Sequence, residues 1–266
     1  MAKVPVAADA AGKSYYKYYE MGIEDLTPEQ QAFVAQCKRP TEDALEAKNR
    51  NKFITDGVWP AETGYYFLEN GGILISANIP MPDVTPDMLY WWFAWHGLEP
   101  LRYAIWDCED HFDAQIDEKG RALALDPNVP MNEKTWGATH VVLESMGGPA
   151  DEITIMFKNP AEMGFDPALI GTDSCEFLVT ANCVLAPYNT PSHMVECAKK
   201  VNGVMTYMCR FWLGYHVIDS EAKYLLPPGI NLPEEAAKGM VGHCIKEFSN
   251  LSKILPSVYA EEKDNW

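Results

Sequence analysis

The chain has 266 residues and a formal net charge of −17 at pH 7, with 47% apolar and 12% aromatic residues. This length and apolar content are sufficient for a folded globule with an ordinary hydrophobic core. The excess of acidic side chains excludes nucleic acid as an expected partner, because phosphate binding requires clustered Lys and Arg. An anionic membrane surface is disfavoured for the same reason, and no run approaches the about 18 consecutive apolar residues of a membrane span.

The start of the chain and its cysteines both indicate a reducing compartment. The sequence MAKVPVAADAAGKSYYKYYE contains no apolar segment of the kind that a secretory signal has. The seven cysteines are scattered without a CxxC pair, which is typical of reduced thiols rather than of a disulfide framework or a Cys-rich zinc site. We therefore expect a cytoplasmic protein.

The first part of the chain is polar and helix-prone. The segment Thr27-Pro28-Glu29-Gln30 has the features of a helix start, with a capping side chain followed by proline at the first helical position. We interpret residues 1–56 as an N-terminal helical arm that packs on a larger domain formed by residues 57–266.

The pattern changes to strands and a Trp-rich helix after the arm. Two β-type runs between Gly64 and Pro80 flank an Asn-Gly turn and predict a hairpin. Thr85 and Pro86 then predict the start of a helix that Gly97 would end. Large aromatic residues at helix-like spacings are more often core residues than substrate contacts, so we expect core positions for Trp91, Trp92, Phe93, Trp95 and Trp106.

The remainder of the chain predicts further strands and one long helix. After a polar segment with the character of a loop, residues 138–146 and 153–160 predict a second hairpin. Residues 175–186 and 203–219 predict two long strands joined by a proline-containing loop, and residues 233–255 predict the helix. This order favours an α+β fold in which a curved antiparallel sheet wraps around the C-terminal helix and leaves a cavity between them.

The last predicted helix carries a histidine and a glutamate on one face. His243 and Glu247 are four residues apart, so their side chains lie one turn apart on a stripe that is otherwise apolar. An imidazole and a carboxylate directed into a core are costly unless they are paired, and a divalent cation would pair both. Because this spacing also arises by chance, other residues must complete the site.

Candidates to complete it lie earlier in the chain. Strand alternation places His140, Val142 and Glu144 on one face, where Glu144 is either a ligand or a partner in an ion pair at the strand end. His111 follows an acidic run and is either a ligand or a solvated loop histidine. The spacing alone does not choose between His111 and His140.

Two further histidines have structural interpretations. His96 ends the Trp-rich helix, where a cation would suit the helix dipole. His216, at the end of an apolar strand, is typical of a satisfied core or edge histidine.

Several of these features together resemble the acylphloroglucinol hydrolases, a family that includes diacetylphloroglucinol hydrolase and phloretin hydrolase. The resemblance runs from about residue 60 to the end and implies a small N-terminal region followed by a Bet v 1-like helix-grip domain, with a homodimer as the assembly. The residues that carry it are Tyr103, Ile105-Trp106, His111, Glu144 in a strand and His243-Cys244-Ile245-Lys246-Glu247 in a late helix.

The resemblance implies a zinc site of His111, Glu144, His243 and Glu247, and it favours His111 over His140. Two imidazoles and two carboxylates suit zinc, although manganese and ferrous iron accept the same ligands. Catalytic zinc usually has three protein ligands and a water. We therefore expect Glu144 or Glu247 to loosen during the reaction and to act as a proton acceptor.

The resemblance also implies residues that contact the substrate. It assigns phenol binding to Tyr103 and Tyr207, with Tyr215 as an alternative to Tyr207, and a catalytic role to His193. The chain departs from the family at Ala114, where relatives can have an asparagine three residues after the first ligand. One substrate hydrogen bond is then missing or replaced.

The reaction implied is hydrolysis of the carbon–carbon bond between an acyl carbonyl and a trihydroxylated ring. In the ring's keto tautomer the substrate is a β-diketone, and zinc would polarise the ketone and activate water. The first expected substrate is the phenolic ketone phloretin, which would be cleaved to phloroglucinol and a hydroxyphenylpropanoate in flavonoid degradation. Diacetylphloroglucinol is the alternative substrate. A non-catalytic carrier of small aromatic ligands and an iron oxygenase with two histidines and one carboxylate are competing classes.

Overall fold

The computed structural model describes residues 2–55 and 62–266. Its strands are β1 (Lys38–Arg39), β2 (Gly64–Phe67), β3 (Ile73–Pro80), β4 (His111–Ile116), β5 (Thr139–Glu144), β6 (Asp151–Lys158), β7 (Phe177–Leu185), β8 (Thr190–Val201), β9 (Val204–Leu213), β10 (Tyr215–Ile218) and β11 (Glu221–Tyr224). Among the described residues, β1 to β9 form one sheet in the order β1-β2-β3-β9-β8-β7-β6-β5-β4. Only β1 and β2 are parallel in this sheet, and β10 and β11 form a separate antiparallel pair.

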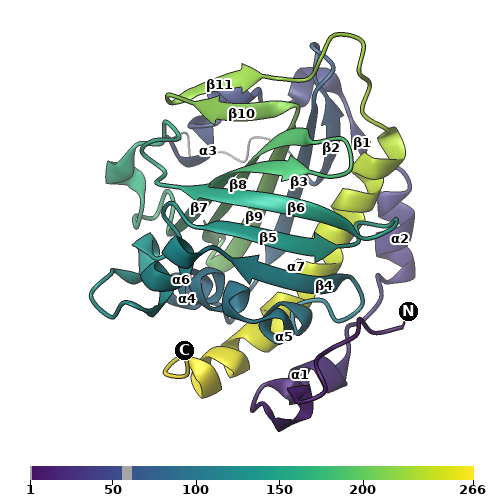
Figure 1. Cartoon of the computed structure of the whole chain (residues 1–266). Helices are drawn as coiled ribbons and strands as arrows, with labels where there is room; N and C mark the ends of the chain where they lie inside the picture. Colours follow the sequence, from purple (N-terminus) through teal and green to yellow (C-terminus); the bar gives the residue numbers. More distant parts are fainter. Residues whose placement is uncertain (1, 56–61) are drawn as a thin grey trace.

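One long helix lies against this sheet. The helices are α1 (Tyr16–Met21), α2 (Pro28–Val34), α3 (Lys52–Thr55), α4 (Pro86–Trp95), α5 (Pro100–Ala104), α6 (Glu118–Leu125) and α7 (Glu234–Glu262). Figure 1 shows α7 crossing one face of the sheet, where it packs on β2 and β3 and against α4. The α+β architecture of an antiparallel sheet around a C-terminal helix is confirmed. Among the described residues, no helix combines the length and apolarity that crossing a membrane would require.

Local signals placed several elements correctly. Thr27 caps α2, because its hydroxyl accepts from the backbone N–H of Gln30 while the Gln30 side chain accepts from the backbone N–H of Thr27. The hydroxyl of Thr85 caps α4 by accepting from the backbone N–H of Met88. The predicted hairpins are present as β2–β3 and β5–β6. The α4 helix itself ends one residue before a 3₁₀ turn, His96–Leu98, that contains the predicted stop.

The prediction of a proline-containing loop between residues 175–186 and 203–219 is wrong. The strand β8 fills most of this interval and pairs with both β7 and β9. Its polar side chains His193, Glu196 and Lys199 are buried, so the strand lacks the apolar and polar alternation of a half-exposed strand. The expected loop before residue 138 likewise contains α5, β4 and α6.

The predicted strand over residues 203–219 is divided in two. Gly214 separates β9 from β10 with a backbone φ of +98°, a conformation that favours glycine. The chain leaves the large sheet at this point and continues as the small β10–β11 sheet.

The buried apolar side chains of the described residues form two clusters, one on each face of the large sheet. We call the face covered by α7 the inner face; its cluster includes Ile75 and Met194. The outer face has a second cluster, to which the N-terminal segment contributes Phe53, and which includes Val195 and Trp212. Successive residues of β8 and β9 therefore point into different cores.

The N-terminal segment is joined to the sheet, because β1 is the strand next to β2. The expected boundary between an arm at 1–56 and a domain at 57–266 lies outside the described residues, so this division stays a prediction. All seven cysteines are buried free thiols.

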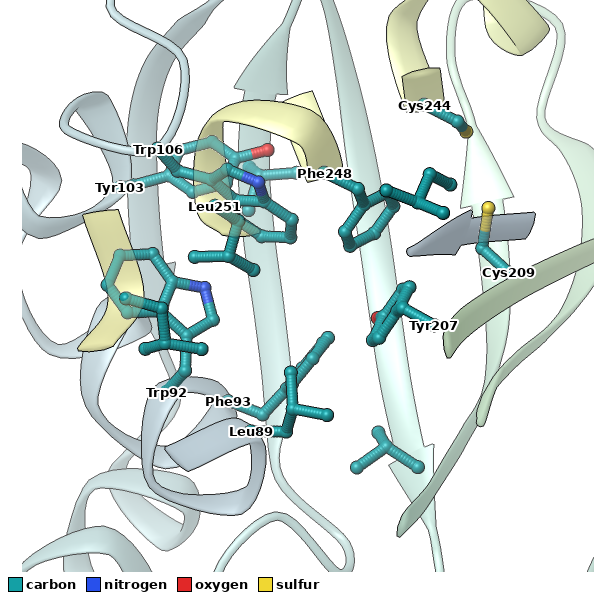
Figure 2. Close-up of a cluster of buried hydrophobic side chains, with 14 of the residues drawn as sticks. Leu89, Trp92, Phe93, Tyr103, Trp106, Tyr207, Cys209, Cys244, Phe248 and Leu251 are labelled. Carbon is teal, nitrogen blue, oxygen red and sulfur yellow. The ribbon is translucent and has the colours of Figure 1, made fainter. Parts of the chain in front are cut away.

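The tryptophans of α4 are core residues, as expected. The rings of Trp91 and Trp95 stack with centroids 4.7 Å apart, and Trp92 packs beside them. Phe93 and Trp106 are also buried in the core, and in addition both line the cavity described below. Figure 2 shows Phe93 and Trp106 among the inner-face side chains.

Candidate metal centre and cavity

A cavity of about 70 Å³ lies between the inner face of the sheet and α7. Most of its wall is aliphatic, aromatic or sulfur-containing, with side chains from β5, β6, β7, β8, β9, α4, α5 and α7. The glutamate, histidine and tyrosine side chains in the wall are His96, Tyr103, Glu144, Glu196, His243 and Glu247.

Strand register and helix spacing bring the four predicted ligands together. His111, the first residue of β4, pairs with Glu144 at the end of β5. The His111 Nε2 atom is 3.4 Å from a Glu247 oxygen and 3.9 Å from a Glu144 oxygen. On α7, His243 Nε2 is 3.7 Å from the other Glu247 oxygen. The side chains of all four residues are at least 87% buried, and His111 is completely buried.

The chemistry of this group fits a divalent cation. His111 Nε2 and both ring nitrogens of His243 have no hydrogen-bond partner among the described residues. One ligand atom from each of His111, Glu144 and His243 lies within 4.8 Å of the others, and Glu247 borders them through the contacts above. Unsatisfied imidazole nitrogens facing carboxylates in an apolar wall are costly without an ion. The donor set suits zinc, manganese or ferrous iron.

Tyr103, on α5, orients two of these ligands. Its ring lies parallel to the His111 ring, with 3.9 Å between centroids, and its hydroxyl donates to a Glu144 oxygen. The backbone carbonyl of Tyr103 is 3.2 Å from His111 Nδ1. A hydrogen bond there places the proton on Nδ1 and leaves Nε2 free toward the site. Burial, and then the charge of Glu144, hold the pKa of Tyr103 well above its ordinary value.

The α7 helix is held to the chain segment before β4 by a buried ion-pair cluster. Lys246 Nζ lies 2.8 Å from Asp110 and 3.3 Å from Asp107. Burial alone would lower the pKa of Lys246, but the hydrogen bond to Asp110 and the charge of Asp107 outweigh it and raise the pKa. Asn250, one turn further along, donates to the backbone carbonyl of Trp106 at 2.8 Å. These contacts fix the position of the helix face that carries the candidate ligands.

The carboxylates of the site affect each other. Burial raises the pKa of Glu247 well above its usual range, and the nearby charge of Glu144 raises it further. Burial, and then His243, hold the pKa of His111 well below its usual range. A cation bound among these side chains would lower the pKa of Glu247, because it would favour the charged form of the carboxylate.

Four histidines lie outside the four-residue group, and three of them, His140, His96 and His216, have structural surroundings. His140 is buried further along β5, with its ring 5.6 Å from that of His96, and burial lowers its pKa to about 3. His96 lines the cavity, but its Nδ1 is 2.8 Å from the backbone carbonyl of Trp92. His216 Nε2 is 2.9 Å from the backbone carbonyl of Cys183, as expected for a satisfied edge histidine. The residue spacing does not choose between His111 and His140 as a ligand. The register of β4 and β5 brings His111 next to Glu144.

The position of His193 contradicts its expected catalytic role. Its ring stacks on Trp212 of the outer cluster with centroids 5.4 Å apart, and its Nδ1 is 3.1 Å from the carbonyl of Ala181. The sheet therefore separates this side chain from the cavity. Two residues of β8 line the cavity, Met194 and Glu196. The sequence does not predict Glu196 as a site residue, because its pattern predicts a loop in place of β8. Strand alternation would have placed Glu196 and His193 on opposite faces.

The two tyrosine alternatives also lie on opposite faces. Tyr207, on β9, belongs to the inner cluster, and its ring centroid lies 4.3 Å from that of Phe248. Figure 2 shows the two side chains next to each other. Phe248 lines the cavity, so Tyr207 is the next layer behind the wall. Tyr215 belongs to the outer cluster, where its hydroxyl accepts from Asn70.

Two curated proteins match almost the whole chain. The sequence is 37% identical to phloretin hydrolase from Eubacterium ramulus, covering 99% of this chain and 96% of that protein. It is 27% identical to 2,4-diacetylphloroglucinol hydrolase from a Pseudomonas species, covering 96% of this chain and 90% of that protein. The crystal structure of Ara h 8.0201 superposes with a TM-score of 0.43 at 10% identity, covering 70% of this chain and 99% of that one. The profile of the family described as DAPG hydrolase PhiG domain matches residues 45–260. The chain therefore belongs to the DAPG hydrolase PhiG domain family, in agreement with the resemblance found in its sequence.

Proposed function

We propose that this protein is a metal-dependent hydrolase that cleaves the carbon–carbon bond between an acyl group and a phloroglucinol ring, with phloretin as the substrate. The observation that carries the proposal is the buried group of two histidines and two glutamates at the inner-face cavity. Family membership and the 37% identity to a phloretin hydrolase support the choice of reaction and of substrate.

We assign metal binding to His111, Glu144, His243 and Glu247, with zinc as the expected ion. A divalent cation held by these side chains would supply a Lewis acid for the acyl carbonyl. Tyr103 keeps the His111 ring and the Glu144 carboxylate in place, as described above. The mostly apolar wall disfavours water in the rest of the cavity, and a substrate that displaced water there would strengthen each polar interaction in the site.

The overall reaction adds the hydroxyl of water to the acyl carbon and a hydrogen to the ring carbon while the bond between them breaks. A side chain must therefore accept a proton from water and return one to the ring. We assign this transfer to the carboxylate of Glu247. Glu144 is held by the hydroxyl of Tyr103, whereas no tyrosine hydroxyl among the described residues donates to Glu247. This contrast supports Glu247, rather than Glu144, as the ligand that loosens.

The cavity must enlarge when a substrate binds. Its volume of about 70 Å³ is well below the roughly 300–1,000 Å³ of typical ligand pockets. Its wall includes Met146, Met194 and Met240, whose unbranched side chains change rotamer readily. Phe248 separates the cavity from Tyr207, so movement of this ring would expose the Tyr207 hydroxyl to a substrate phenol.

Product analysis tests the proposal directly. Purified protein that contains about one zinc ion per chain is incubated with phloretin and, separately, with diacetylphloroglucinol. Release of phloroglucinol and a hydroxyphenylpropanoate from phloretin, abolished by chelation and restored by metal, would support it. Release of acetate from the second compound alone would keep the reaction and change the substrate. If neither compound is cleaved by the metal-loaded protein, the proposed function is wrong.

Two variants test the assignment of the ligands. Glu247→Gln should abolish turnover while retaining part of the bound metal, because the amide oxygen still coordinates but does not accept a proton. Glu144→Gln should retain measurable turnover if metal is supplied in excess. The reverse pattern would exchange the roles of the two glutamates. The homodimer implied by the family resemblance stays a prediction, to be checked by light scattering.

A further inference from the structure

A second polar position lies in the cavity wall, separate from the four candidate metal ligands. Glu196 comes from β8 and is 2% exposed, and its side chain lines the cavity. Its Oε2 atom has no hydrogen-bond partner among the described residues. A buried carboxyl oxygen without a partner costs free energy comparable to a lost hydrogen bond, so its presence needs a reason.

Glu196 faces the metal-binding group from another part of the sheet. The strand β8 is three strands away from β5 in the sheet order, which corresponds to about 14 Å along the curved sheet. Cys183, on the intervening β7, also lines the cavity. The pKa of its thiol is raised first by burial, then by the charge of Glu196 and then by that of Glu144. The two carboxyl groups thus border one cavity from different sides.

The wall between these two polar positions is apolar. It includes Ile153, Ile155 and Leu185 from the intervening strands β6 and β7. Tyr207 lies beside Glu196, where its hydroxyl interacts with the carboxyl group and shifts the pKa of both side chains, but the geometry leaves the Tyr207 hydroxyl and Glu196 Oε2 without a full hydrogen bond among the described residues. A ligand hydroxyl donates one hydrogen bond and accepts others, so it would satisfy both the carboxyl group and the tyrosine. A polar group at each end with an apolar middle matches a ligand with two polar ends and an apolar linker.

We infer that Glu196 binds the phenolic hydroxyl on the second ring of a two-ring acylphloroglucinol and thereby selects such substrates over single-ring ones. The inference rests on the proposed function, because it takes the acyl carbonyl to lie at the metal-binding group. Glu196 is then a specificity-determining residue. It does not act on the bond that breaks.

The test compares three substrates on the wild-type protein and two variants. The substrates are phloretin, its analogue in which the second ring carries no hydroxyl, and diacetylphloroglucinol, which has no second ring. Glu196→Met removes the polar group with little change in volume, and Glu196→Gln is the conservative variant that keeps hydrogen bonding. The measured quantity is kcat/KM on the zinc-loaded protein.

Wild-type protein should prefer phloretin over the analogue without the hydroxyl by about 10- to 100-fold, because that hydroxyl satisfies a buried group. Glu196→Met should lose most of this preference by losing activity on phloretin, with less than about threefold change on the other two substrates. Glu196→Gln, in contrast, should keep much of the preference for phloretin. Comparing substrates on one preparation removes the effect of any misfolded fraction.

An equal loss of kcat/KM on all three substrates in Glu196→Met would overturn the inference, because it would indicate a general structural or catalytic role. An unchanged preference in both variants would overturn it as well. Both results leave the proposed function intact, since wild-type protein still cleaves phloretin. Failure of the wild-type protein to cleave any of the three would overturn the function and the inference together.

Discussion

The rings of Tyr103 and His111 lie almost parallel, with 3.9 Å between centroids and 5° between planes. The same tyrosine donates its hydroxyl to Glu144, so one side chain orients an imidazole by contact and a carboxylate by a hydrogen bond. Partners of this kind fix the orientation of metal ligands before an ion binds. The contribution of the hydroxyl can be separated from that of the ring.

Tyr103→Phe keeps the stacked ring and removes only the hydrogen bond to Glu144. We expect metal affinity to fall by about 10- to 100-fold, the usual effect of losing an outer partner of a ligand. Competition with a chelator of known affinity measures the change.

Tyr65→Phe is the matched control for that experiment. Tyr65 is also buried and also donates its hydroxyl to a glutamate, Glu234 at the start of α7, but it lies away from the cavity wall. Metal affinity should be unchanged in this variant. Equal losses of affinity in both variants would mean that the effect arises from general destabilisation.

Lys246→Met should strongly destabilise the fold. Its ammonium group is buried against Asp107, Glu109 and Asp110, and removing it takes the lysine partner away from the buried carboxylates of Asp107 and Asp110. Breaking a buried ion pair by removing one partner typically costs about 3–5 kcal/mol of unfolding free energy. Urea denaturation measures this cost.

The control is Lys253→Met, seven residues further along the same helix, where the lysine pairs with Glu24 at the surface. Exposed ion pairs contribute about 0–1 kcal/mol, so this variant should stay close to the wild type. A loss at Lys246 no larger than the loss at Lys253 would show that the acidic cluster does not depend on the buried lysine.

His193→Gln should leave catalysis nearly unchanged, because His193 lies on the outer face, against Trp212. We expect kcat/KM on phloretin within about threefold of the wild type when it is normalised to folded protein. A loss of several orders of magnitude with unchanged metal content would show that His193 reaches the substrate after all.

The same variant should alter how stability depends on pH. Burial lowers the pKa of His193 from 6.5 to about 3, so the folded protein does not protonate this ring until the pH falls far below the pKa of the unfolded chain. The contribution of the neutral, buried His193 ring to the unfolding free energy is fully present above pH 6.5 and is lost as the pH falls toward about 3.

At about pH 5 the wild type should have lost about 2 kcal/mol more unfolding free energy, relative to about pH 8, than His193→Gln. Urea denaturation at the two pH values provides the comparison. Parallel pH profiles for the two proteins would contradict the prediction.

Patterns local in sequence predicted much of the fold. The cap at Thr27, the turn between β2 and β3, and the helical spacing of His243 and Glu247 each depend on residues a few positions apart. Such signals can be recognised in a single sequence because they act through contacts between residues that are close along the backbone.

The features that failed depend on contacts distant in sequence. The strand β8 is buried on both faces, and polar residues such as Lys199 within it are accommodated by tertiary structure that no local pattern reveals. The prediction that His193 reaches the substrate has the same origin, because without a strand there is no face to assign. The choice of His111 over His140 rests on which residue of β4 pairs with Glu144, and the residues alone did not decide it.

The four candidate ligands join parts of the chain that are otherwise far apart. His111 and Glu144 lie at the β4 edge of the sheet, whereas α7 packs on β2 and β3 toward the opposite edge. A cation bound by all four would act as a cross-link that closes a loop of nearly half the chain, which limits the conformational freedom of the unfolded state. Its binding free energy would add to that of folding. Chelation should therefore lower the melting temperature as well as stop the reaction.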